Sequence, residues 1–252
     1  MLDIISSSST RIKTGLALVV ALLIIGFIDS FLLTWLLFGG LMFVALNEAM
    51  KLFSIDEDKL YIYGLVVWVA SYFYPKPEDL VFVIGIIFAS ILAYTKDLDK
   101  KLFLPLMYPI ASYLFLFSLY ISFGMSSLLW LLVVVAGADV GAYFVGKSFG
   151  STPFCLTSPN KTLEGVVGGV ITATILGVAF SLEQFGFWES LFISLIVAIA
   201  SVFGDLFESY LKREADVKDS GDILPGHGGI LDRTDGYLFG GIIMLILLRF
   251  FA

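Results

Sequence analysis

The chain has 252 residues, of which 59% are hydrophobic, and a mean hydropathy of +0.97. Only 15% of its residues are charged, against roughly 25% in soluble domains, so the composition excludes an ordinary soluble fold with its polar shell. The formal charge of −7 argues against nucleic acid as a partner. One cysteine and one histidine exclude an internal disulfide and a four-ligand Cys/His zinc site.

Apolar segments follow one another along the whole chain, and a helix needs about 20 mostly apolar residues to cross a bilayer. We therefore predict an all-α, polytopic integral membrane protein with about nine transmembrane helices. They are predicted over 12–28, 31–50, 60–75, 78–95, 103–123, 126–146, 163–182, 186–210 and 235–252.

Lysine and arginine are distributed unevenly over the loops that these helices define. With the N-terminus in the cytoplasm, thirteen of the 15 basic residues fall on the cytoplasmic side, and only Lys76 and Arg249 fall on the other. This positive-inside bias predicts a cytoplasmic N-terminus and cytoplasmic loops after the sixth and eighth helices. We expect residues 1–124 to form a scaffold that also dimerises, and residues 125–252, rich in glycine and carboxylates, to carry the active site.

Acidic residues gather between Asp205 and Asp235, a segment that holds eight of the 22 in the chain. Asp205 and Glu208 lie in the predicted eighth helix, where residues three apart share one face. An ionised carboxylate inside a membrane is costly unless it is paired or bound to a metal. Asp139 in the sixth helix poses the same problem, and structural pairing with Lys or Arg is the alternative for all three.

The loop before the ninth predicted helix reads Leu224-Pro-Gly-His-Gly-Gly-Ile-Leu-Asp-Arg-Thr-Asp235. Its glycines allow positive φ and close approach to a ligand, and free N–H groups in such a loop can hold phosphate. Basic residues around the loop suit phosphate oxygens and carboxylates suit Mg²⁺, which together are typical of enzymes that act on phosphoryl groups. A simple turn is the alternative for the glycines.

A second loop, Ser158-Pro-Asn-Lys-Thr-Leu-Glu-Gly165, joins the sixth and seventh predicted helices on the same side. Lys161 lies just ahead of a helix start, where backbone N–H groups also attract anions. An ordinary helix cap by Thr162 is the alternative. Three glycine pairs with small-xxx-small spacing, Gly137/Gly141, Gly165/Gly169 and Gly236/Gly240, favour helix packing.

Residues 209–235 resemble the signature of the phosphatidate cytidylyltransferases, or CDP-diacylglycerol synthases. The signature consists of Ser, Lys-Arg after two residues, Lys-Asp after four more, a Pro-x-His-Gly-Gly core and a closing Asp-Arg-x-Asp, and the chain meets every fixed position. Residues 158–165 resemble the family's Ser-Pro-Lys-Lys-Thr-Trp-Glu-Gly, departing at Asn160 and Leu163. Residues 138–146 resemble its Asp-x-x-Ala-Tyr segment.

The resemblance implies transfer of the cytidylyl group of CTP to phosphatidate, with Mg²⁺ and with allowance for a second cation. It also implies a homodimer in the cell (inner) membrane with the site facing the cytoplasm, and no nucleic-acid partner. Oxygen ligands favour Mg²⁺, and we predict Asp205, Asp232 and Asp235 as its ligands. The predicted catalytic residues are Lys218, Asp219 and His227, with a structural role in the turn as the alternative for His227. The predicted substrate-binding residues are Ser158, Lys161, Thr162, Lys212, Arg213, Gly228, Gly229 and Arg233.

Two other functions share part of this pattern. A CTP-dependent polyprenol kinase would transfer the γ-phosphoryl group and release CDP. A cation transporter would use Asp139, Asp205 and Glu208 as an ion path, but that function leaves the long loop of glycine, histidine and arginine unexplained.

Overall fold

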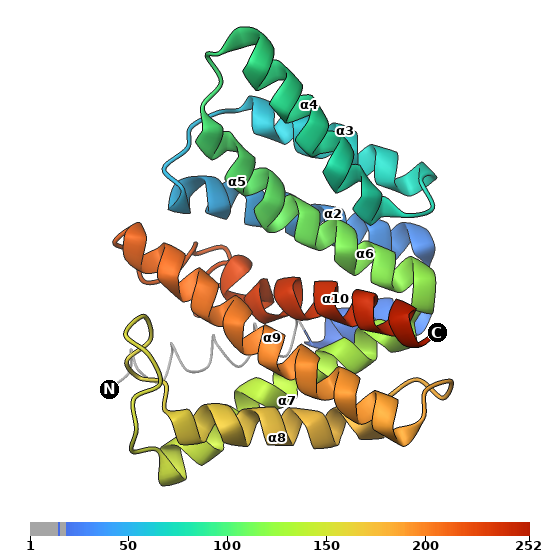
Figure 1. The fold of residues 1–252 in the computed structure, drawn as a ribbon, viewed down its shortest axis with the longest axis vertical. Coiled ribbons are helices and arrows are strands. Elements are labelled where there is room, and N and C mark those ends of the chain that lie inside the picture. The colour runs from blue at the N-terminus through green and yellow to red at the C-terminus, as the bar shows by residue number, and fades with distance from the viewer. Residues whose placement is uncertain (1–14, 16–18) are drawn as a thin grey trace. The chain divides into compact units, whose positions relative to one another are not determined.

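The computed structural model describes residue 15 and residues 19–252, and the described chain is helical, which confirms the predicted all-α class (Figure 1). The only extended pairings within these residues are two isolated bridges, Pro153 with Thr162 and Leu224 with Gly228. After an apolar helix at Val19–Ile28 come the main helices α2 (Phe31–Leu52), α3 (Lys59–Phe73), α4 (Leu80–Thr95), α5 (Phe103–Pro105), α6 (Ser112–Phe123), α7 (Met125–Phe149), α8 (Leu163–Ala179), α9 (Phe187–Glu214) and α10 (Leu231–Phe251). Short 3₁₀ turns at Pro77–Asp79 and Lys100–Leu102 precede α4 and α5, and a π-helical turn at Leu106–Ala111 joins α5 to α6.

Six helices of the described chain are long and apolar enough to cross a membrane. Shorter apolar helices lie at Val19–Ile28, Lys59–Phe73 and Leu163–Ala179. Each of the nine predicted segments coincides with one of these nine helices, although residues 12–14 and 16–18 of the first lie outside the described residues. The protein is therefore a membrane protein, while the count of nine crossings and the side of the N-terminus stay predictions.

Two predicted helix boundaries are wrong, and both errors concern the polar segment between α9 and α10. The eighth predicted helix ends at residue 210, but α9 continues to Glu214 and places Lys212 and Arg213 in its last turn. The ninth begins at residue 235, but α10 begins at Leu231 and places Asp232 in its first turn. Hydropathy misses these turns because backbone hydrogen bonds, and not apolar side chains alone, decide where a helix begins and ends.

The described chain divides into two compact units. The first joins residues up to Phe117 with the segment Glu214–Arg233, and the second joins Ser118–Arg213 with Thr234–Ala252. The segment Glu214–Arg233 thus belongs to the same unit as the N-terminal helices, whereas the predicted division at residues 124 and 125 places it with the C-terminal half. The assignment of scaffold and catalytic roles to the two halves stays a prediction.

Aromatic side chains hold α2 against α3 in the first unit. Trp35 donates from Nε1 to the carbonyl oxygen of Trp68 (3.1 Å), and Trp68 donates back to that of Trp35 (3.3 Å). Trp68 is fully buried, and a Cβ at Gly39 would stand 2.4 Å from its Nε1. Because both indole N–H groups find partners, Trp68 is buried and Trp35 half-buried at little cost.

Small residues bring α7 and α8 together in the second unit, where Figure 1 shows the two helices side by side. A Cβ at Gly141 would lie 2.7 Å from Thr172, and one at Gly169 would lie 2.5 Å from the carbonyl oxygen of Ala138. This close contact confirms the packing role that the glycine spacing predicts. On α7, buried Trp130 also donates to Ser194 of α9 (3.0 Å), which ties a third helix to the pair.

Candidate active site

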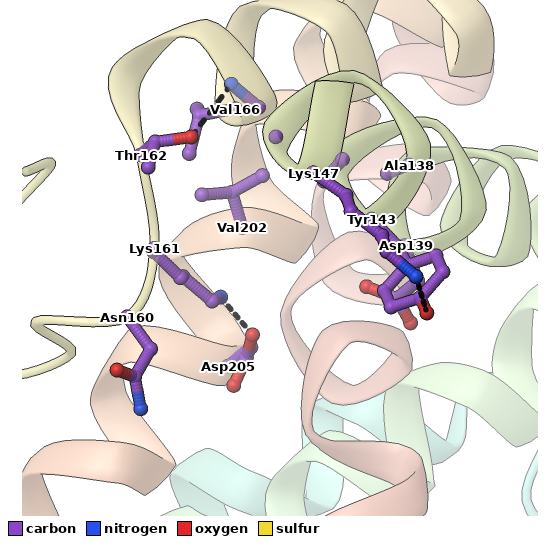
Figure 2. A pocket seen from close by; sticks show the side chains of 13 residues that line it. Ala138, Asp139, Tyr143, Lys147, Asn160, Lys161, Thr162, Val166, Val202 and Asp205 are labelled. Carbon is purple, nitrogen blue, oxygen red and sulfur yellow. Dashed lines mark hydrogen bonds and ion pairs between the residues drawn. The ribbon is translucent and has the colours of Figure 1, made fainter. Parts of the chain in front are cut away.

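A pocket of about 520 Å³, lined by apolar and charged side chains, opens in the second unit. Its walls come from α7, from the loop before α8, from the start of α8 and from α9. Figure 2 shows Asp139, Tyr143 and Lys147 on one side and Lys161 and Asp205 on the other. The volume lies within the usual range for pockets that bind small molecules.

Lys161 and Asp205 meet in this pocket as an ion pair, in which the lysine ammonium donates to Oδ2 of the carboxylate (Figure 2). The two side chains are 28% and 29% exposed, so solvent reaches the pair from the pocket. Ser209, one turn further along α9, lies with its hydroxyl 3.4 Å from Oδ1 of Asp205. The pair brings together a predicted phosphate-binding residue and a predicted metal ligand that are 44 positions apart.

The loop that carries Lys161 has a defined shape. Phe154 donates to the carbonyl oxygen of Lys161 (2.8 Å), and Leu163 donates to that of Thr152 (2.9 Å). Glu164 accepts from the backbone N–H and the hydroxyl of Thr152 (3.2 and 2.8 Å) and makes the same two bonds with Ser151. The loop is therefore folded back on itself ahead of α8, which fixes the position of Lys161.

Two other predicted residues of this loop shape it. Thr162 caps α8, because its hydroxyl accepts from the N–H of Gly165 (3.2 Å). Ser158 accepts at its carbonyl oxygen from the N–H of Lys161 (3.0 Å) and makes a turn. The helix-cap interpretation of Thr162 is thus confirmed, and a direct contact of either residue with substrate stays a prediction.

Carboxylates gather where α9 meets the beginning of α10 within the second unit. Asp235 forms a side-chain hydrogen bond with Glu208 and lies within Coulombic range of Asp205. Glu208 is fully buried and pairs with Lys212 (3.3 Å). Carboxyl groups are therefore concentrated beside the pocket, and their oxygens are the type of ligand that Mg²⁺ prefers.

The segment 218–233 forms a second polar cluster, in the first unit. Oδ2 of Asp232 accepts from the N–H and the hydroxyl of Ser220 (2.8 and 2.9 Å) and from the N–H of Gly229 (2.9 Å). A Cβ at Gly228 would stand 2.8 Å from the same oxygen, and its φ is +84°. Asp232 therefore organises the loop of residues 220–231, the glycine loop, and only glycine fits at position 228.

The backbone donors of the glycine loop already have partners inside the protein. The N–H of His227 donates to Leu224, that of Gly229 to Asp232, and those of Ile230 and Leu231 to Glu48. The sequence predicts free N–H groups in this loop. At these four positions the N–H groups instead have hydrogen-bond acceptors inside the protein. Binding of substrate by Gly228 or Gly229 stays a prediction, and these four N–H groups give it no support.

His227 and Arg233 lie close together at the end of this loop. The guanidinium of Arg233 donates from two nitrogens to the carbonyl oxygen of His227 (2.9 and 2.7 Å). The Nδ1 atom of His227 is buried and has no hydrogen-bond partner within the described residues. Lys218 and Asp219 are exposed at the other end of the segment.

The predicted site residues thus fall into two groups, one in each unit. The pocket group, in the second unit, contains Lys161, Thr162 and Asp205, with Ser158 in the same loop and Lys212, Arg213 and Asp235 on the neighbouring turns. The loop group contains Lys218, Asp219, His227, Gly228, Gly229, Asp232 and Arg233. Sequence reasoning missed Glu48, which lies in an apolar helix far from either motif, and Lys147, which lines the pocket.

The donors available for Mg²⁺ are chemically suitable, because Asp205, Asp232 and Asp235 offer only carboxylate oxygens. Asp205 and Asp235 interact within the second unit. Among the residues that the structure describes, no three His, Cys, Asp or Glu side chains are grouped closely enough to hold a metal ion. The residues fit the ion by chemistry, and the ligand set stays a prediction.

Apolar helices along the described chain define the class of the protein as a membrane protein, and its pocket is lined by lysine and carboxylate side chains. The sequence model of the cytidylyltransferase family matches residues 9–251, and the chain belongs to this family. A phosphatidate cytidylyltransferase of Helicobacter pylori (strain ATCC 700392 / 26695) is 44% identical over 96% of this chain and 92% of its own length. One of Bacillus subtilis (strain 168) is 46% identical over 52% of this chain and 50% of its own.

Proposed function

We propose that the protein transfers the cytidylyl group of CTP to phosphatidate and releases CDP-diacylglycerol and pyrophosphate. The observation that carries this proposal is the pocket in which Lys161 and Asp205 meet. Its support from the whole chain is the family match over residues 9–251 and the 44% identity to a phosphatidate cytidylyltransferase.

The reaction requires charge neutralisation more than a strong base. Phosphatidate is a phosphate monoester whose second pKa is about 6, so its attacking oxygen is largely ionised at neutral pH. That oxygen attacks the α-phosphorus of CTP, the bond to the β-phosphate breaks, and pyrophosphate leaves with the electron pair. Both substrates are polyanions, so positioning and electrostatic stabilisation provide most of the catalysis.

Basic side chains bind the phosphates in this proposal. The ammonium of Lys161 is paired with Asp205 in the structure, and in this proposal it turns from the carboxylate to a phosphate oxygen of the substrate. Lys212 at the end of α9 is held in a similar way by Glu208. Arg213, Lys218 and Arg233 complete the set of cations, and Ser158, Thr162, Gly228 and Gly229 shape the two loops that carry it.

Carboxylates have the complementary role. The carboxylates of Asp205, Asp232 and Asp235 would be the ligands of Mg²⁺, which would neutralise phosphate charge when bound. A second cation is also compatible with this excess of carboxylates. Asp219 orients Lys218, and His227 assists the departing pyrophosphate through a ring nitrogen.

The location of the enzyme follows from where its substrates are. CTP comes from the cytosol and phosphatidate from the bilayer, so we place the site at the cytoplasmic surface of the cell's inner membrane. The positive-inside distribution of lysine and arginine supports this orientation. The proposal includes a homodimer, which crosslinking of the purified protein in detergent would test.

Labelled CTP tests the reaction directly. The purified protein is given phosphatidate, Mg²⁺ and CTP that carries label in either the α- or the γ-phosphate. We expect the α-label in the lipid fraction and the γ-label in pyrophosphate. Recovery of γ-label in lipid and α-label in CDP would establish a kinase and overturn the proposal.

A further inference from the structure

A buried carboxylate of α2 accepts hydrogen bonds from the backbone of the glycine loop. Glu48 is only 3% exposed, although it lies in an otherwise apolar helix. Its Oε1 accepts from the N–H of Ile230 (3.0 Å), and its Oε2 accepts from the N–H of Leu231 (2.8 Å). Oε2 also lies 3.2 Å from the hydroxyl of Ser220. All four residues belong to the first unit.

Glu48 caps the N-terminus of α10, a role that in other helices usually falls to a residue next to the helix in sequence. The first N–H groups of a helix have no partners within it and carry partial positive charge. Ile230, which precedes Leu231, has no polar side chain that could accept from them. The carboxylate of Glu48 supplies both acceptors from another helix, so the start of α10 depends on it.

Two glycines allow this contact. A Cβ at Gly221 or at Gly229 would stand 2.6 Å from Oε1 of Glu48, which is closer than a Cβ atom comes to a non-bonded neighbour. The carboxylate is therefore enclosed between the two ends of the loop. Substituting either glycine would displace it.

Ser220 connects Glu48 to a predicted metal ligand. Its hydroxyl lies 3.2 Å from Oε2 of Glu48 and 2.9 Å from Oδ2 of Asp232. A serine hydroxyl has one proton and can donate to only one of these carboxylates at a time. Glu48, Ser220 and Asp232 therefore form one chain of contacts, in which a displacement of the first changes the surroundings of the last.

We propose that Glu48 is a positioning residue of the active site, which anchors the loop 220–231 and thereby sets the place of the Asp232 carboxylate. Glu48 contacts no substrate in this proposal and acts only through Ser220 and the first turn of α10. The inference rests on the proposed cytidylyltransferase function, since it concerns the same site.

The variant Glu48→Gln tests the proposal with little change in size. A carboxamide has one acceptor oxygen, so its NH₂ group would face one of the two N–H donors of Ile230 and Leu231. We expect kcat for CTP and phosphatidate to fall about tenfold or more, with little change in KM for either substrate. Loss of anchoring should also speed trypsin cleavage after Lys218, a readout that needs no activity.

The matched control is Glu78→Gln, which changes another buried carboxylate of the first unit, 5% exposed, in the short turn before α4. We expect this variant to keep both kcat and the cleavage pattern of the parent protein. If Glu48→Gln also behaves like the parent in both assays, the proposal is overturned.

The variant Ser220→Ala keeps the proposal testable if Glu48→Gln does not fold. Ser220→Ala should lower kcat by itself. If Glu48→Gln does fold, the double variant should lose less than the product of the two single effects. A parental rate for Ser220→Ala would overturn the proposal. A wild-type protein that makes no CDP-diacylglycerol would instead refute the proposed function, while faster trypsin cleavage of Glu48→Gln would still support the anchoring of the loop.

Discussion

Replacing Lys161 by alanine removes one of the two lysines that line the pocket and leaves Asp205 without its ion-pair partner. Both side chains are more than a quarter exposed to the pocket, so the loss of the pair itself should cost about 1 kcal/mol of stability or less. The effect on catalysis should be larger, because the phosphates of CTP and phosphatidate lose a charged donor. A hydrogen bond to a charged group contributes about 1.5–3 kcal/mol, which corresponds to a fall in kcat/KM of roughly 10- to 100-fold.

Initial rates with α-labelled CTP and phosphatidate in mixed micelles measure this loss, and a melting curve in detergent measures stability. Lys161→Arg should recover part of the activity, because it keeps the positive charge. Lys59→Ala is the control, since it removes a lysine from an exposed ion pair with Glu57 (3.7 Å) in another part of the chain. Unchanged kcat and KM for Lys161→Ala would show that the pocket does not bind the phosphates.

Two further substitutions test the carboxylates and the packing. Asp205→Asn should abolish turnover while the protein stays folded in detergent, because a neutral amide is a poor Mg²⁺ ligand; near-parental activity would remove Asp205 from the metal site. Gly169→Ala places a methyl group 2.5 Å from the carbonyl oxygen of Ala138, so thermal unfolding should show about 1–3 kcal/mol of destabilisation. Gly40→Ala meets nothing within 4 Å in α2 and should not destabilise, and equal melting temperatures for the two variants would contradict this account of α7 and α8.

The helices were the most predictable part of the protein. Each predicted span coincides with a helix because a chain in lipid must satisfy its backbone hydrogen bonds internally. The ends of α9 and α10 were less predictable, since their polar turns resemble a loop by hydropathy. α10 begins four residues before the predicted start, where Glu48 accepts its first N–H groups.

The sequence by itself determined the all-α membrane class and the residue types of the site, because hydropathy and short motifs are local properties. Only the tertiary structure decided which of those residues meet. Lys161 and Asp205 pair across 44 positions, and Glu48 contacts Leu231 across 183. No local pattern marks Glu48, since its partners are backbone N–H groups whose positions exist only once α2 and the glycine loop have packed together.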